Sequence, residues 1–291
     1  MTKYYQPSGS FSPVSFLYFI LSSIIIIPIL ALIYTYLVWY IPFIYINFFI
    51  TIGLGVGVGM TMKYVVQLGK VRNPKLGLAF GFLGGLLALY FSWVVWLNLI
   101  INSAATGESS NIVEQLLTIA GNPEAVYELG KIINSTGTWG FGETAISGTF
   151  LTIIWLIESL IIMFFAVSGP YPSAKAPFCE LDDKWFDEKK LLPFKVIINP
   201  QEIISKLESA SPESFEALTL EYNSLTKSHS VFTLYSSPKG ENFLSIENKL
   251  AKINDKGEVS FDDDMLVEYI SLNSSLKEIL LRKLTGESTE D

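Results

Sequence analysis

Residue types that carry catalysis or bind metals are scarce in this chain. It holds one cysteine, Cys179, and one histidine, His229. The chain therefore has almost none of the cysteine and histidine residues needed for a zinc site, a cysteine–histidine pair or a serine–histidine–aspartate triad. Cys179 lies among Glu180, Asp182 and Asp183, and acidic neighbours do not activate a thiol as a nucleophile. The sequence predicts no catalytic residue, no metal and no cofactor, and it indicates that the protein is not an enzyme.

Glu158 is the one ionisable side chain inside a long apolar run, residues 146–167. A charged side chain at the centre of a bilayer costs about 2.5–3.5 kcal/mol on the insertion scale. The other apolar runs hold no basic residue between their ends. We expect a protonated carboxyl bonded to a hydroxyl or amide, or one paired with another protein. The functional interpretation is a proton or cation relay or a docking point, and the alternative is a satisfied packing carboxyl. The hydrogen-bonding candidates are Ser22, Ser23, Asn47 and Thr51.

Glycines at helical spacing mark two neighbouring apolar runs. They are Gly53, Gly55, Gly57 and Gly59 in the first run and Gly77, Gly81, Gly84 and Gly85 in the second. Residues four apart share a helix face, and small faces let helices pack closely in lipid. The simplest interpretation is that these glycines pack the two runs together. The alternative is that the first run is pliable or faces partners on two sides, as in an oligomer, a pore or a gate. The pattern is no nucleotide-binding loop, because no strand precedes it and it lacks a Walker lysine.

Membrane-spanning helices must position these residues. Half of the 291 residues are hydrophobic, and four apolar runs are long enough to cross a bilayer core. They are residues 16–38, 44–62, 76–101 and 146–167. Pro28 is expected to kink the first run. The sequence predicts an all-α membrane domain over residues 16–168, preceded by a short segment at residues 1–15.

Charge orients the four predicted spans. The loop between the second and third spans has no acidic residue and four basic ones, Lys63, Lys70, Arg72 and Lys75. The loop at residues 102–145 has Lys131 against five glutamates. By the positive-inside rule the first loop is cytoplasmic and the second is outside, so both termini are cytoplasmic. Abundant isoleucine, lysine and asparagine favour a bacterial source, and hence the bacterial inner membrane.

The outer loop is too long for a simple connector. Asn111 and Asn122 are expected to cap two short amphipathic helices. These helices would lie on the outer membrane surface or on the spans. A glycine-rich segment with Trp139 and Phe141 is expected to re-enter the bilayer after them.

The remaining chain carries the whole net charge. Residues 170–291 hold fourteen Lys and Arg against twenty-two Asp and Glu, whereas residues 1–169 balance to zero. An acidic surface does not displace counterions from nucleic acid and is not attracted to anionic lipid. We therefore expect no nucleic-acid partner.

Turn and periodicity signals divide this acidic part into a linker at residues 169–194, an α+β domain at residues 195–285 and a disordered tail at residues 286–291. Strands are expected at residues 195–198, 231–236 and 243–253, and helices after Asn199, from Ser211 and over residues 273–284. The run Asp262–Asp264 is expected to cap a following segment, because it lacks the spacing and glycine of a calcium-binding loop.

Three functions remain open on these grounds. The first is a structural or regulatory multi-pass membrane protein whose acidic cytoplasmic domain binds a protein partner. The second is a small channel or transporter that uses Glu158, formed as a homo-oligomer because four spans enclose little space. The third is an intramembrane enzyme, which would need a second polar group beside Glu158. The first is favoured, because the folded tail shows no chemical site.

Overall fold

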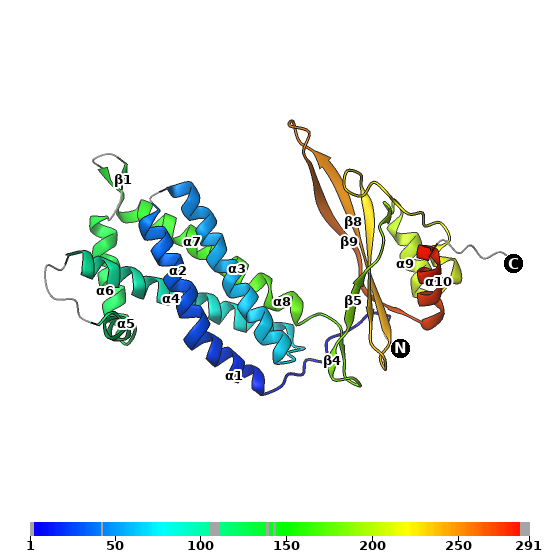
Figure 1. The fold of residues 1–291 in the computed structure, drawn as a ribbon, viewed down its shortest axis with the longest axis horizontal. Helices are drawn as coiled ribbons and strands as arrows, with labels where there is room; N and C mark the ends of the chain where they lie inside the picture. Colours follow the sequence, from blue (N-terminus) through cyan, green and yellow to red (C-terminus); the bar gives the residue numbers. More distant parts are fainter. Residues whose placement is uncertain (1–2, 42, 105–110, 138–139, 142–143, 286–291) are drawn as a thin grey trace. The chain divides into compact units, whose positions relative to one another are not determined.

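The computed structural model describes residues 3–41, 43–104, 111–137, 140–141 and 144–285 of the chain. These residues fold into two compact units, Ser8–Lys175 and a second made of Met1–Pro7 with Ala176–Asp291. The first unit is helical and the second contains antiparallel sheets (Figure 1). The expected glycine-rich segment lies largely outside the described residues, as does the tail at residues 286–291.

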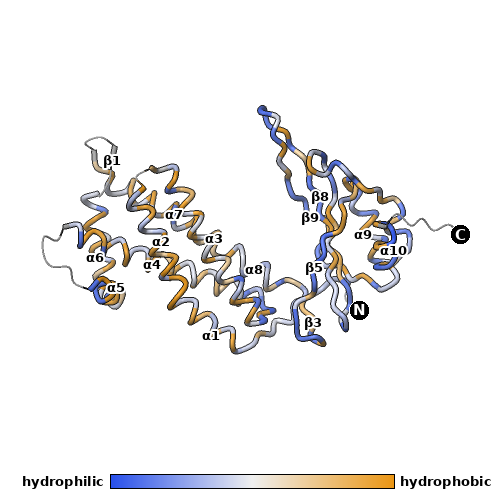
Figure 2. The backbone as a smooth tube through the Cα atoms, viewed as in Figure 1, coloured by the Kyte–Doolittle hydropathy of each residue, from blue (hydrophilic) through white to orange (hydrophobic). Residues whose placement is uncertain are grey.

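The helical unit contains four helices that are long and apolar enough to cross a membrane, counted over the described residues. They are Val14–Tyr40, Tyr45–Leu68, Pro74–Ser103 and Gly148–Ser173. The first comprises α1 (Val14–Leu21), the π-helix η1 (Ser22–Ile26) and α2 (Ile27–Tyr40), and the others correspond to α3 (Ile44–Leu68), α4 (Pro74–Ala104), and α7 (Gly148–Ser168) with α8 (Pro170–Ser173). Figure 2 shows that hydrophobic residues dominate these helices.

The π-helix η1 ends at Ile26, two residues before Pro28, and the Ile27 amide donates to the Ser22 carbonyl. A proline removes one donor from a helix, and a π-helical turn is a local departure from α-helical hydrogen bonding inside a longer helix. The irregularity expected from Pro28 therefore takes the form of a π-helical turn just before it. The kink itself stays a prediction.

Two helices follow the third span, α5 (Ile112–Ala120) and α6 (Pro123–Thr136), and both predicted caps are confirmed. The side chain of Asn111 accepts from the amide of Val113, and that of Asn122 accepts from the amide of Ala125. Apolar residues of α6 and α4 form one cluster, which includes Val94, Leu97, Val126 and Ile133. Of the two expected placements, the structure gives packing against the spans. A short antiparallel hairpin, β1 (Gly140–Phe141) and β2 (Thr144–Ala145), precedes α7.

The second unit is built on an antiparallel sheet in the order β5-β7-β8-β9, with β6 also paired to β7. Its strands are β5 (Asp187–Lys190), β6 (Phe194–Lys195), β7 (His229–Ser236), β8 (Asn242–Ile253) and β9 (Val259–Leu272), and a separate small hairpin comprises β3 (Phe178–Cys179) and β4 (Lys184–Trp185). Helices α9 (Pro200–Glu208), α10 (Ser274–Thr285) and the 3-10 helix η2 (Pro212–Phe215) belong to the same unit. Helices α9 and α10 lie on one face of the sheet (Figure 1).

The core of this unit lies between the sheet and these helices. Strand residues that alternate along β7 and β8 face it, among them Phe232, Leu234, Leu244 and Ile246. Alternation along a strand places every second side chain on one face. The helices contribute Ile203, Leu207, Phe215, Leu276 and Leu280 to the same cluster. Burial of this apolar cluster against the sheet makes the second unit a domain with its own core.

Most elements expected in this unit are present, and three expectations need correction. The segment from Ser211 forms a 3-10 helix of four residues, with the Ser211 hydroxyl accepting from the Glu213 amide. The run Asp262–Asp264 was expected to act as a cap and instead lies inside β9, opposite residues 248–250 of β8. The unit also begins at Ala176, before the expected boundary at residue 195, because β5 pairs with β7.

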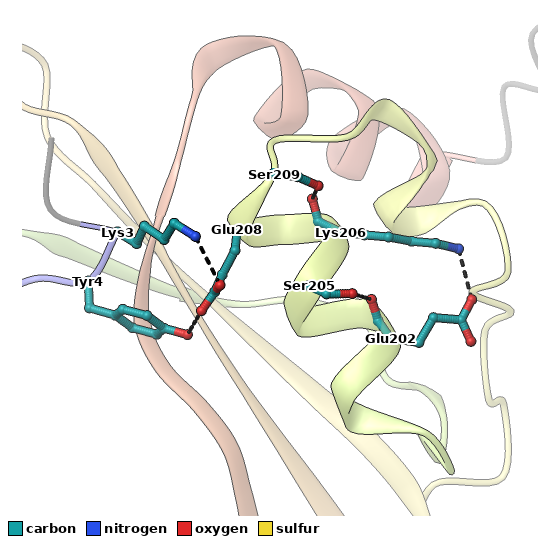
Figure 3. Close-up of polar contacts among 7 residues, drawn as sticks. All are labelled: Lys3, Tyr4, Glu202, Ser205, Lys206, Glu208 and Ser209. Atoms are coloured by element: carbon teal, nitrogen blue, oxygen red, sulfur yellow. Dashed lines mark hydrogen bonds and ion pairs between the residues drawn. The ribbon is translucent and has the colours of Figure 1, made fainter.

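The segment at the chain's N-terminus belongs to this unit and extends its sheet. Tyr4 bridges to Ile270 in antiparallel register. The Tyr5 amide donates to the Tyr269 carbonyl at 2.9 Å, and the Ser271 amide donates to the Lys3 carbonyl at 2.8 Å. Lys3 and the Tyr4 hydroxyl both reach the Glu208 carboxylate on α9, at 3.0 Å and 2.8 Å (Figure 3). Residues 3–7 are thus part of the sheet-containing unit rather than a separate segment ending at residue 15.

Candidate functional site

Glu158 lies midway along α7, half-buried against neighbouring helices. One and two turns later, Ile162 and Ala166 are fully buried on the same side of the helix. This side faces α3, because a Cβ added at Gly55 would lie 3.0 Å from the Ile162 carbonyl oxygen. One turn further along α3, Gly59 contacts Phe165, which lies further along α7 than Ile162. The two helices α3 and α7 therefore run in the same direction. Thr51 precedes Gly55 by one helical turn, and Glu158 precedes Ile162 by one helical turn. Thr51 and Glu158 therefore lie at the same level along the two helices.

Thr51 and Tyr34 join Glu158 in a polar cluster between three spans. The Tyr34 side chain of α2 lies close to the side chains of Thr51 and Glu158. Thr51 is 1% exposed, and its hydroxyl donates to the Asn47 carbonyl at 2.9 Å. The side-chain oxygen of Asn47, one turn earlier on the same helix face, is buried and has no hydrogen-bond partner among the described residues. We call Tyr34, Asn47, Thr51 and Glu158 the polar cluster.

The sequence pointed to part of this cluster. Thr51 and Asn47 were candidates and lie on the α3 face described above, whereas Ser22 and Ser23 belong to η1, three turns from Tyr34 along the first span. Tyr34 was missed, because nothing in its local sequence connects it to a carboxyl on the last span. A carboxyl, a phenol, a hydroxyl and an amide supply oxygen ligands that suit a proton or a hard cation.

The glycines of α3 contact two different helices. Gly55 and Gly59 lie against the backbone of Ile162 and Phe165 in α7, where an added Cβ would overlap backbone or Cβ atoms. Gly57 faces the side chain of Leu30 in α2, and Gly53 has open space around it. The second span therefore packs on two neighbours of the same chain, and the expected role in an oligomer, a pore or a gate stays a prediction.

The glycines of α4 also serve the last span. An added Cβ at Gly77 would lie 2.8 Å from the Pro170 carbonyl oxygen, and one at Gly81 would lie 2.7 Å from the Ala166 carbonyl oxygen. Gly85 contacts Met163 of α7. Gly84 alone of these four faces α3, at the side chains of Met62 and Val58. The expectation that the glycines pack spans two and three together thus holds at Gly84, and close approach to α7 and α8 accounts for most of the others.

Cys179 and His229 are both buried in structural surroundings. The Cys179 thiol lies 3.0 Å from where a Cβ on Gly240 would stand. Nδ1 of His229 lies 2.9 Å from the Lys227 carbonyl oxygen, and its ring meets Phe261 edge to face. Hydrogen bonds from the Ser237 hydroxyl and the Lys239 amide hold the pKa of the nearby Asp182 carboxyl below its usual range. Over the described ranges, no three His, Cys, Asp or Glu side chains gather as metal ligands would.

The strands β8 and β9 continue beyond the rest of the sheet. Strand β7 pairs with β8 as far as His229 opposite Lys249, and β8 with β9 as far as Ile253 opposite Val259. Residues 250–262 therefore form a two-stranded ribbon, which we call the arm (Figure 1). Two of its apolar side chains are exposed, Leu250 by 38% and Ile253 by 70%. The arm and the polar cluster are the two features of the described chain with functional potential.

Comparison with known proteins adds no further constraint on these two features: no family model, curated protein or solved structure matches the chain.

Proposed function

We propose that this is a multi-pass protein of a bacterial inner membrane whose C-terminal domain binds a protein partner on the cytoplasmic side. The four spans anchor the domain, and the domain's acidic surface selects the partner. The role is structural or regulatory. Both termini lie in the cytoplasm in this proposal, with the loop at residues 102–145 outside.

The observation that carries the proposal is the arm. A two-stranded ribbon is at best marginally stable in water by itself, and this one leaves Leu250 and Ile253 open to solvent. Ion pairs join the two strands within the arm, Lys252 with Asp262, and at its base, Lys249 with Asp263. Exposed apolar groups rimmed by charges are typical of surfaces that bind another protein.

The N-terminal segment supports the proposed topology. Residues 3–5 add to β9 of the same folded unit that follows the last span. A chain whose two ends fold into one domain crosses the membrane an even number of times, in agreement with four spans. The basic residues Lys63, near the end of α3, and Lys70, in the loop after it, support the cytoplasmic side for that domain.

Site-specific photo-crosslinking tests the proposal. A photoreactive residue placed at Ile253 in the full-length protein, in its native membrane, is expected to form a discrete adduct with one foreign protein. The matched control position is Ile198, which is 90% exposed in the same unit but outside the arm, and it should give no such adduct. Equal adducts from both positions, or none from Ile253, would contradict partner binding by the arm.

A second candidate function, a proton or cation pathway, is favoured by the polar cluster. In proteoliposomes, flux down an imposed gradient should fall in Glu158→Gln and in Thr51→Val, since each removes a group of the cluster. Thr61→Val is the matched control, because Thr61 bonds to a carbonyl four residues back just as Thr51 does. Vesicles that stay tight under every gradient, or equal loss in the control, would rule this function out.

A further inference from the structure

The outer edge of β9 is open along most of its length. Strand β9 runs for 14 residues and ends the sheet order, and the N-terminal segment bridges to it at Ile270. Among the described residues, no strand pairs with the outer edge of residues 259–268. An open edge presents a row of backbone donors and acceptors that can take up another strand.

The N-terminal segment shows how this edge is used. It pairs antiparallel, so that Tyr4 lies opposite Ile270 and the chain runs from there toward residue 268. Pro7 lies two residues after Tyr5, and a proline cannot donate to a strand ladder. Pairing therefore stops beside Tyr269, whose positive φ of 54° marks the bulged stretch of β9. The free part of the edge begins where this native strand ends.

Acidic side chains line the free part of the edge. Asp262, Asp263 and Asp264 are consecutive and exposed, and Met265 beside them is 52% exposed. Successive strand residues point to opposite faces, so carboxylates border the edge on both faces. Asp262 and Asp263 each have a lysine partner on β8, whereas Asp264 lies opposite the uncharged Asn248.

These charges decide between two occupants. A second copy pairing edge to edge at this stretch would bring like charges opposite one another, which is destabilising. An extended segment with basic side chains at alternate positions would place its charges beside the carboxylates. Its backbone would complete the ladder, as in other cases of strand addition, where main-chain bonds supply affinity and alternate side chains supply specificity.

We propose that residues 259–268 of β9 form a strand-addition site for an extended, basic segment of a partner protein. This inference rests on the proposed partner-binding function and names its surface and its ligand chemistry. The partner strand lies in line with residues 3–5 on the same edge, and Met265 gives it an apolar contact between the charges.

The test uses the full-length protein in nanodiscs of zwitterionic lipid and a fluorescent ten-residue peptide that alternates lysine and valine. Binding is followed by fluorescence anisotropy. Asp264→Lys should weaken binding about tenfold, because a like charge then faces the peptide. Asp255→Lys makes the same charge change in the turn at the arm's tip and should alter binding less than about twofold. A peptide with glutamate in place of lysine should not bind.

Backbone pairing has its own readout. Two peptides with N-methyl groups on alternate residues, in opposite registers, remove the donors from one edge or the other. One register should abolish binding and the other should retain it, and bound peptide should slow amide exchange in residues 259–268. Equal binding by both methylated peptides, or by Asp264→Lys and wild-type protein, would overturn the inference. If the peptide fails while Ile253 still crosslinks to one partner, the strand-addition site is wrong and the partner-binding function stands.

Discussion

Replacing Gly55 by alanine tests how closely α3 and α7 approach each other. The added Cβ would lie 2.8 Å from the Phe165 Cβ, 3.0 Å from the Ile162 carbonyl oxygen and 3.1 Å from the Ile162 Cα. These are backbone and Cβ atoms, which no change of rotamer can move aside. Gly53, two residues earlier in the same helix, has nothing within 4 Å of an added Cβ and provides the control, Gly53→Ala.

The size of the effect follows from these distances. Carbon atoms in good contact lie about 3.5–4.0 Å apart, so the helices must separate by about 1 Å to admit the new methyl group. Forcing a methyl group into a packed interior costs about 1–3 kcal/mol. Alanine is about 1 kcal/mol better than glycine within a helix. We expect Gly55→Ala to lose up to about 2 kcal/mol of unfolding free energy, and Gly53→Ala to gain up to about 1 kcal/mol.

The assay is reversible unfolding of the full-length protein in mixed micelles with increasing SDS, followed by tryptophan fluorescence. The predicted result is a lower midpoint for Gly55→Ala and an unchanged or higher midpoint for Gly53→Ala. The reasoning is refuted if the two variants shift the midpoint equally, or if Gly53→Ala is the less stable of the two.

Three further predictions concern the sheet-containing unit. Asn248→Leu removes the buried side chain that bonds to the backbone after β6, so amide exchange there should accelerate by the equivalent of about 1–3 kcal/mol. Leu280→Ala should lower the unfolding free energy by about 2–5 kcal/mol, because it leaves a cavity under α10. Ile198→Ala, at an exposed position, should change the unfolding free energy by no more than about 0.5 kcal/mol. Denaturant unfolding measures both variants. Bonds from Tyr4 and Lys3 hold the pKa of Glu208 below its ordinary value of 4.5. The stabilisation of the N-terminal segment by ionised Glu208 is therefore complete above about pH 4.5 and is lost as the pH falls below it. Protection of the Tyr5 amide, measured relative to its intrinsic exchange rate, should decline in that range. In Glu208→Gln this protection should not depend on pH.

Local patterns in the sequence were enough for the helical unit. Four apolar runs of sufficient length, with Glu158 as the one acidic or basic side chain inside them, predicted the candidate spans, because length and composition alone decide whether a helix can cross a bilayer. The caps at Asn111 and Asn122 followed from side chains that act on amides two or three residues away. The last helix and the hairpin strands were predictable for the same reason, since turns and periodicity are local.

Contacts between distant segments were not predictable in the same way. The spacing of Gly55 and Gly59 shows that one helix face is small, but it does not say which helix comes close. Tyr34 joins Glu158 through the packing of α2 against the other spans. Nothing local showed that residues 3–5 would complete a sheet formed by residues more than 200 positions later.

The run Asp262–Asp264 shows how tertiary structure overrides a local pattern. Consecutive aspartates favour caps and turns and are poor strand formers. In the structure they continue β9, because Lys249 and Lys252 on β8 lie across from them and neutralise part of the charge. The pairing partner is supplied by the register of two long strands, which the aspartates themselves do not specify.

The central claim is that the membrane-anchored C-terminal domain binds another protein through the arm. Native mass spectrometry of the full-length protein, gently extracted from its own membrane, tests it most directly. We predict a stoichiometric complex with a foreign subunit, which dissociates in a variant carrying Ile253→Asp and is retained with Ile198→Asp. A protein that is found alone or only with copies of itself would contradict the claim and favour the pathway through Glu158.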